Sequence, residues 1–147
     1  MGFFSNVFNT GGGDTTLSAN EAFMGTLLAV IAVDGHIADE EVGEFKNLLG
    51  KAKMLRSMTD GEYKSAIDKI LRIVRKEGSF KLFELCAQFL PQDKRQGVFA
   101  MACDMLFADG VVENEEEKLL ELMKAKFAIS DDFARKVAEV SVAKASV

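Results

Sequence analysis

The residues best suited to chemistry in this chain are carboxylates, and they occur in two similar short motifs. Residues 33–41 read VDGHIADEE, and residues 108–116 read ADGVVENEE. Each motif has an Asp-Gly pair, an apolar residue two positions later and a Glu-Glu pair at its end. Carboxylate oxygens are the ligands that hard divalent cations such as Ca²⁺ and Mg²⁺ prefer. The motifs therefore point to metal binding.

Four acidic residues take equivalent places in the two motifs, and we identify them as the candidate metal ligands: Asp34, Glu41, Asp109 and Glu116. Further oxygen ligands lie close by in the sequence, namely Asp39, Glu40, Glu113, Asn114 and Glu115. His36, the single histidine, lies in the first motif, where it would add a nitrogen ligand. Because Val111 takes the equivalent place in the second motif, we interpret His36 first as a surface residue. The predicted cofactor is a divalent cation, with Ca²⁺, Mg²⁺, Zn²⁺ and Mn²⁺ left open.

Each motif matches only the second half of an EF-hand calcium loop. An EF-hand has glycine at its sixth position and a glutamate that binds through both oxygens at its twelfth. With Gly35 at the sixth position, Glu41 falls at the twelfth, and the second motif aligns in the same way. Positions one and three, however, would be apolar in each motif: Val30 and Ala32, or Met105 and Phe107. One motif therefore holds too few oxygens for Ca²⁺, which takes about 6–8, and only a facing pair could make a site.

A purely structural interpretation accounts for the same residues. An aspartate at a helix end can accept hydrogen bonds from the backbone of its own loop, as Asp34 and Asp109 would. Glutamates in the first turn of a helix, such as Glu41 and Glu116, are favoured by the exposed N–H groups there. A duplicated hairpin duplicates its turns and caps as well. The repeat alone therefore does not decide between a metal site and a set of caps.

The two motifs belong to a longer internal repeat. A shift of 75 positions superimposes apolar residues on both sides of the motifs: Phe23 on Val98, Ile31 on Leu106, Phe45 on Leu120 and Leu48 on Met123. Within each copy such residues recur at helical spacing, and Gly35 or Gly110 would supply a left-handed turn between two helices. The repeat predicts one helix–loop–helix unit used twice. A pseudo-twofold pairing of the two units would bring the acidic motifs together.

Apolar residues at helical spacing along the chain, with a single proline, predict an all-α fold of about seven helices. Capping-box patterns at 18–21 (Ser-Ala-Asn-Glu) and 59–62 (Thr-Asp-Gly-Glu) predict the starts of two helices. The other predicted boundaries are Gly78 as a helix end, Ser79 and Ser130 as helix caps, and Pro91 between two helices. Residues 1–16, with three consecutive glycines at 11–13, are expected to form a flexible or loosely packed segment, and residues 17–147 the helical domain.

Composition narrows the class of protein. A chain of 147 residues with 48% hydrophobic residues is long enough for one domain with its own core. The net charge of −5 argues against nucleic acid as a partner. Cys86 and Cys103 lie in apolar helical patterns without metal-ligand or redox spacing, so we expect buried, reduced thiols. The longest apolar run, residues 27–33, is too short for a bilayer, which takes about 20 residues, and we expect a soluble, cytoplasmic protein.

Charge is segregated along the chain. Residues 1–50 carry a net charge of −6, residues 51–95 a net charge of +5 and residues 96–147 a net charge of −4. A basic segment between two acidic ones favours charge-complementary protein partners. This pattern gives an alternative function, that of a metal-free interaction adaptor with segregated acidic and basic faces. We expect no enzymatic activity, because the chain shows neither a nucleophile–base pair nor a glycine-rich phosphate loop.

Two stretches of the chain resemble a known family. The sequences FMGTLLAVIAVDGHIADEEVGEFKNLL (residues 23–49) and GVFAMACDMLFADGVVENEEEKLLELMKAKFAIS (residues 97–130) are similar to the TerB family of tellurite-resistance proteins, over most of residues 20–132. The resemblance implies an all-helical domain with a pseudo-symmetric core and a role in resistance to tellurite and related chemical stress. It also implies a cytoplasmic part of a metal-linked protein complex at the inner face of the membrane, with its metal site at Asp34, Glu41, Asp109 and Glu116.

Overall fold

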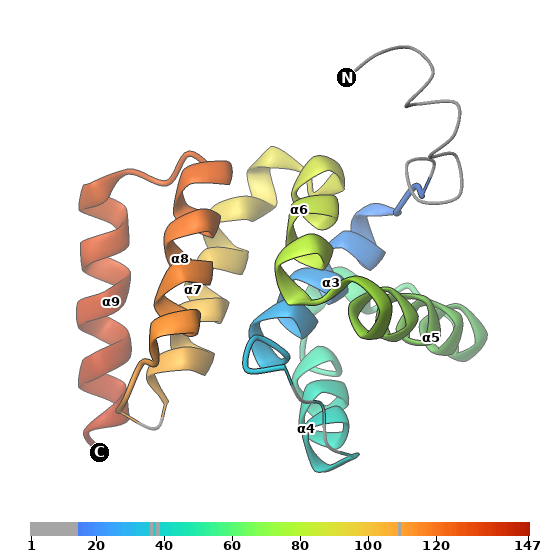
Figure 1. The fold of residues 1–147 in the computed structure, drawn as a ribbon, viewed down its shortest axis with the longest axis horizontal. Coiled ribbons are helices and arrows are strands. Elements are labelled where there is room, and N and C mark those ends of the chain that lie inside the picture. Colours follow the sequence, from blue (N-terminus) through green and yellow to red (C-terminus); the bar gives the residue numbers. More distant parts are fainter. Residues whose placement is uncertain (1–14, 36, 38, 109) are drawn as a thin grey trace.

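The computed structural model describes residues 15–35, 37, 39–108 and 110–147. These residues form seven α-helices and two 3₁₀ helices, and none of them lies in a β-strand (Figure 1). In chain order the elements are α3 (Ala19–Ile31), α4 (Asp39–Leu49), η1 (Lys53–Leu55), α5 (Asp60–Glu77), α6 (Ser79–Phe89), η2 (Gln92–Lys94), α7 (Arg95–Phe107), α8 (Asn114–Lys126) and α9 (Asp131–Ala145). The prediction of an all-α fold with about seven helices is confirmed.

Side-chain caps set the starts of three helices, at the residues that the sequence predicts. At α3 the Ser18 hydroxyl accepts a hydrogen bond from the N–H of Glu21 at 3.0 Å, and the Glu21 carboxylate accepts one from the N–H of Ser18 at 2.8 Å. Thr59 and Glu62 form the same reciprocal pair at α5. The Ser130 hydroxyl caps the first turn of α9. These bonds satisfy N–H groups that a helix start otherwise leaves without a partner.

The prediction that Ser79 caps a helix is wrong. Gly78, with φ of 89° and ψ of 170°, is the C-cap of α5 and also the N-cap of α6. A residue with a Cβ atom rarely adopts this φ, which explains the glycine. Because this one glycine makes the whole turn, Ser79 is already the first residue of α6, and no side chain caps that helix start.

A helix boundary does lie at Pro91, as predicted. α6 ends at Phe89, and Pro91 precedes the short 3₁₀ helix η2. The next α-helix, α7, therefore begins only at Arg95 and not directly at the proline.

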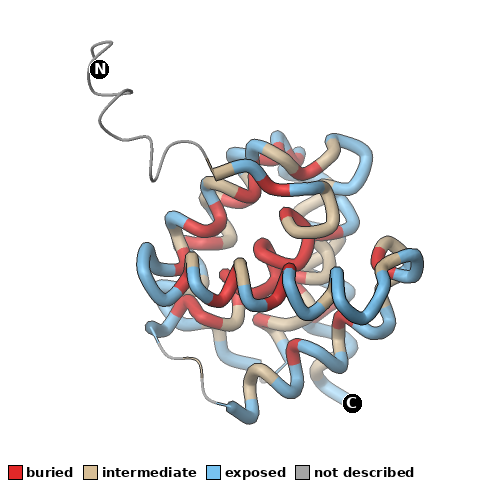
Figure 2. Tube along the Cα trace, turned by 90° about the vertical axis from the view of Figure 1, so that its right-hand side faces the viewer, coloured by how far each residue is buried: buried red, intermediate tan, exposed pale blue. Residues whose placement is uncertain are grey.

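Helix α3 lies at the centre of the fold. It packs against α4, α5, α6 and α7, and α7 in turn packs against α8 and α9 (Figure 1). Nine consecutive residues of α3, from Ala22 to Val30, are buried, which is the pattern of a helix enclosed on all sides. In Figure 2 the buried segments gather in the middle of the molecule, with exposed segments around them.

The two copies of the internal repeat meet through their first helices. α3 and α7 pack on each other, whereas the second helices of the copies, α4 and α8, are set apart in Figure 1. A pseudo-twofold relation between the two copies stays a prediction.

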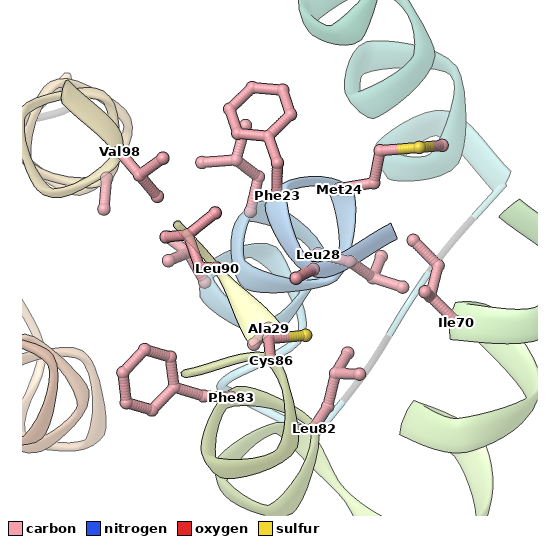
Figure 3. Packing of buried hydrophobic residues seen from close by; sticks show 14 of the residues in the cluster. Phe23, Met24, Leu28, Ala29, Ile70, Leu82, Phe83, Cys86, Leu90 and Val98 are labelled. Carbon is pink, nitrogen blue, oxygen red and sulfur yellow. The ribbon is translucent and has the colours of Figure 1, made fainter. Parts of the chain in front are cut away.

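Helices α3 and α6 approach closely at Gly25. A Cβ atom at this position would lie 2.4 Å from the Sγ atom of Cys86 and 3.4 Å from Cδ1 of Leu82. Figure 3 shows Leu82 and Cys86 of α6 facing α3 among the buried side chains. The glycine is therefore required by the packing of the two helices, because it leaves room for the thiol.

Cys86 and Cys103 are both buried free thiols, as predicted. Burial raises the pKa of Cys86 to about 12 and that of Cys103 to about 11, because a thiolate is costly to form away from water. At neutral pH both thiols are protonated and react slowly. They are therefore poor candidates for direct chemistry on tellurite.

In the described part of the chain, no helix is long and apolar enough to cross a membrane. The division between residues 1–16 and residues 17–147 stays a prediction, because residues 1–14 lie outside the described residues.

A polar contact joins the last helix, α9, to α7. The Asp104 carboxylate accepts a hydrogen bond from the Ser141 hydroxyl at 2.7 Å and one from Lys144 Nζ at 2.6 Å. Ser141 is buried between the two helices, with 4% of its surface exposed. Burial raises the pKa of Asp104, but the hydrogen bonds from Lys144 and Ser141 and the charge of Lys144 together outweigh it. The net pKa lies below its ordinary value of 3.8.

Replacing Gly25 with alanine is expected to lower the free energy of unfolding by about 1–3 kcal/mol, because the added methyl group overlaps Cys86 Sγ in a packed core. Urea unfolding measures the change. Gly43→Ala on α4 is the matched control, because nothing lies within 4 Å of a Cβ atom there. Alanine should raise the stability of that helix by up to about 1 kcal/mol. If the Gly25→Ala protein is as stable as the parent, the close approach of α3 and α6 at this residue is contradicted.

Replacing Asp104 with asparagine is expected to destabilise the protein at neutral pH, because the amide carries no charge to pair with Lys144. Folding lowers the pKa of Asp104, so its contribution is present above pH 3.8 and lost as the pH falls through the lower folded pKa. Since the carboxylate is 44% exposed, we expect a difference of only roughly 1 kcal/mol at pH 7. The free energies of unfolding of parent and variant, measured with urea, should converge as the pH falls below 3.8.

Asp132→Asn is the control for this prediction. Asp132 pairs with Lys136 at 3.0 Å on an exposed face of α9, and loss of a surface pair should change stability by less than about 0.5 kcal/mol. If the difference in free energy of unfolding between Asp104→Asn and the parent does not change with pH, the assigned role of the charge is contradicted.

Candidate metal site

The first acidic motif forms the turn between α3 and α4. α3 ends at Ile31, and Ala32 is its C-cap. Gly35 then takes a φ of 92°, and its N–H donates a hydrogen bond to the carbonyl oxygen of Ala32 at 2.9 Å. Asp34 is exposed on this turn, and α4 begins at Asp39.

The second acidic motif forms the same backbone turn between α7 and α8. Gly110 has a φ of 79°, and its N–H donates a hydrogen bond to the carbonyl oxygen of Phe107 at 3.0 Å. α8 begins at Asn114, the counterpart of Asp39 in the repeat. The predicted left-handed turn at Gly35 and Gly110 is thus confirmed in both motifs.

Neither loop offers the first half of an EF-hand. Val30 and Ala32 are buried and Met105 and Phe107 are half-buried, and all four lie in a helix or at its end. Their side chains hold no ligand oxygen and pack inward. A cation at these loops would therefore need carboxylates from both motifs.

The four candidate ligands lie in three different settings. Asp34 is exposed on the first turn, while Glu41 and Glu116 are half-buried in the first turns of α4 and α8. Asp109 lies outside the described residues, as does His36. Among the residues that the structure describes, no group of three or more His, Cys, Asp or Glu side chains could hold a metal ion. Asp34, Glu41 and Glu116 therefore do not form such a group among themselves, and the four-carboxylate site stays a prediction.

Glu116 has a structural role at the start of α8. Its Oε1 atom accepts a hydrogen bond from the backbone N–H of Glu113 at 2.8 Å, and Glu113 is the N-cap of the helix. This is half of a capping box. The interpretation of the glutamate as a helix-start acid therefore holds for Glu116, and one of its two oxygens already has a partner.

A cleft of about 510 Å³ lies beside the two loops. Gly35 and Ile37 of the first loop line it, and so does Glu115 from the first turn of α8. The C-terminal end of α5 and the N-terminal end of α6 form the remaining walls. The two acidic motifs therefore border one cleft, although the described candidate ligands are not among the residues that line it.

The sequence did not predict which residues would complete this cleft. The second motif contributes Glu115, which was treated only as a neighbour of the proposed ligands. The walls from the middle of the chain are Val74, Arg75, Glu77, Gly78, Ser79, Phe80 and Lys81. The one signal that could have indicated them was the excess of basic residues in the segment 51–95.

Glu116→Ala is expected to lower the free energy of unfolding by about 1 kcal/mol, because the N–H of Glu113 loses its acceptor at the helix start. Glu116→Gln should keep most of this stability, since the amide oxygen can accept the same hydrogen bond. Glu117→Ala removes an exposed acid from the same turn and should change the free energy by less than about 0.5 kcal/mol. Urea unfolding compares the three variants, and equal effects of Glu116→Ala and Glu117→Ala would exclude the capping role.

Comparison with known proteins agrees with these features. The model of one family, described as "Tellurite resistance protein TerB", matches residues 20–139 of the chain. The matched range runs from α3 into α9 and contains both acidic loops. Comparisons with curated proteins and with solved structures gave no match. Because the family model covers most of the chain, the resemblance seen in the sequence is confirmed, and the protein belongs to the TerB family of tellurite-resistance proteins.

Proposed function

We propose that this protein is a non-enzymatic module of tellurite and chemical-stress resistance that binds or senses a divalent cation through its two acidic loops. Family membership supports the association with tellurite resistance. One observation carries the cation proposal: the two motifs make the same glycine turn, and Gly35 and Ile37 of the first motif and Glu115 of the second border a single cleft.

The charge around the loops favours a bound cation. Five acids of the two motifs and their helix starts are exposed at or beside the loops: Asp39, Glu40, Glu113, Glu115 and Glu117. Lys118 pairs with Glu115 at 3.0 Å, but both side chains are more than half exposed, so the pair contributes little. A divalent cation would relieve the repulsion between these carboxylates.

The proposed ligands are Asp34, Glu41, Asp109 and Glu116. Their carboxylates are hard oxygen donors of the kind that suits Ca²⁺, Mg²⁺ or Mn²⁺. Asp34 and Asp109 each lie between two helices of one repeat copy, so a shared cation would join the copies. Binding to the folded state alone would then stabilise the protein.

The proposed setting is a cytoplasmic protein complex at the inner face of the membrane. The segregated charges support protein partners: Lys64, Arg72, Arg75 and Lys76 on α5 form no ion pair within the described part of the chain. The same observation favours the second candidate function, a metal-free adaptor that docks acidic partners on this basic face.

Calorimetric titration of the chelator-treated protein with Ca²⁺, Mg²⁺, Zn²⁺ and Mn²⁺ tests the proposal. We expect one of these ions to bind with measurable heat. At a concentration of about one hundred times the dissociation constant it should stabilise the fold by about 2.7 kcal/mol. The double variant Asp34→Ala/Asp109→Ala should lose most of this binding, because it removes one proposed ligand from each loop.

Asp68→Ala/Asp93→Ala is the matched control for the titration. It removes the same charge from exposed positions on α5 and η2, so it should bind the cation as the parent does. Absence of heat and of any shift in melting temperature with all four ions would exclude the cation and favour the adaptor. Equal loss of binding in both double variants would show that only the net charge matters, and that the ligand assignment is wrong.

A further inference from the structure

The cleft beside the loops also contains the uncapped start of α6. The backbone N–H groups of Ser79, Phe80 and Lys81 make no hydrogen bond within the described residues. The first N–H groups of a helix have no partner inside the helix, and here the N-cap residue, Gly78, has no side chain to accept from them. Gly78 and the three residues that follow it all line the cleft. Three hydrogen-bond donors at the positive end of a helix therefore border the same space.

The hydroxyl of Ser79 is a second, independent donor in this cleft. Ser79 is 8% exposed and lines the cleft, and its side chain makes no hydrogen bond within the described part of the chain. Its oxygen atom is not among the buried side-chain atoms that lack a partner, so this oxygen still reaches solvent. The unpaired hydroxyl of an otherwise buried residue is therefore open to a ligand that enters from the cleft.

Two basic side chains complete the set of donors. Arg75, near the end of α5, and Lys81, in the first turn of α6, line the cleft, and neither forms an ion pair within the described residues. Two acids, Glu77 and Glu115, also line it, but Glu115 is paired with Lys118. The two basic groups therefore lie near the donors of α6, together with Glu77 at the end of α5, while Glu115 comes from a different helix, α8.

We propose that this cleft binds a small oxyanion with two negative charges, such as tellurite, phosphate or sulfate. Several oxygens on one centre can accept from the three N–H groups and from the Ser79 hydroxyl at once, while Arg75 and Lys81 balance the charge. A volume of about 510 Å³ is ample for such an ion. The proposal concerns the part of the cleft at the start of α6, and it does not depend on whether a cation binds to the acidic loops.

Nuclear magnetic resonance titration of the ¹⁵N-labelled full chain tests the proposal. Sodium tellurite, phosphate and sulfate are added separately at constant ionic strength, with EDTA present so that no cation takes part. We expect saturable shifts of the amide signals of Ser79, Phe80 and Lys81 with at least one anion. If tellurite binds most tightly, we conclude that the cleft is a tellurite site. If phosphate or sulfate binds most tightly, we conclude that the cleft is a site for that ion. No saturable shift of these amides with any of the three anions would overturn the proposal.

Three single variants locate the ion. Ser79→Ala, Arg75→Ala and Lys81→Ala should each weaken binding roughly tenfold, because each loses one hydrogen bond to a charged ligand. Lys64→Ala is the matched control: it removes the same charge from an exposed position about three turns earlier on the same helix, and Lys64 does not line the cleft. The affinity of this variant should stay within about twofold of the parent, since an exposed charge farther away than the Debye length is screened by salt. Equal weakening by Lys64→Ala and Arg75→Ala would show general attraction to a basic surface and would overturn the site.

Discussion

Helix α3 buries nine consecutive residues among four neighbouring helices, and α6 lies directly against it at Gly25. The Sγ atom of Cys86 takes the space where a side chain of α3 would otherwise begin. The two helices are antiparallel, so the C-terminal end of α3 and the N-terminal end of α6 lie in the same region. Ala32 and Ser79 accordingly line one cleft. The position of the first acidic loop relative to α6 is thus a consequence of the packing at one glycine.

The charged side chains of this cleft come from three helices. Arg75 and Glu77 belong to the end of α5, Lys81 to the first turn of α6 and Glu115 to the first turn of α8, so the lining holds two bases and two acids. The start of α6 adds N–H donors, because this helix begins without a side-chain cap. In the two proposals above, an oxyanion would bind to these donors and a cation would bind to carboxylates of the loops.

The features that the sequence predicted correctly are those set by local chemistry. Ser18 and Thr59 cap their helices because a hydroxyl three residues before a glutamate satisfies the first N–H groups wherever the helix lies. Ser79 has the same type of side chain, yet the turn at Gly78 lets α6 begin one residue earlier than predicted, at Ser79 itself. The cleft could not be predicted, because its walls come from segments far apart in the sequence. Their meeting depends on how closely α3 and α6 pack, which the hydrophobic pattern does not encode.

The internal repeat preserves the backbone turn more closely than the side chains around it. Gly35 and Gly110 have nearly the same φ and make equivalent hydrogen bonds, but the helix starts that follow differ. In the second copy the N-cap is Glu113, and its backbone N–H donates a hydrogen bond to Glu116. The equivalent residue of the first copy is alanine at position 38, which lies outside the described residues. A cation between the loops would have to share the carboxylate of Glu116 with the backbone of its own helix start, so metal binding and capping are coupled at this residue.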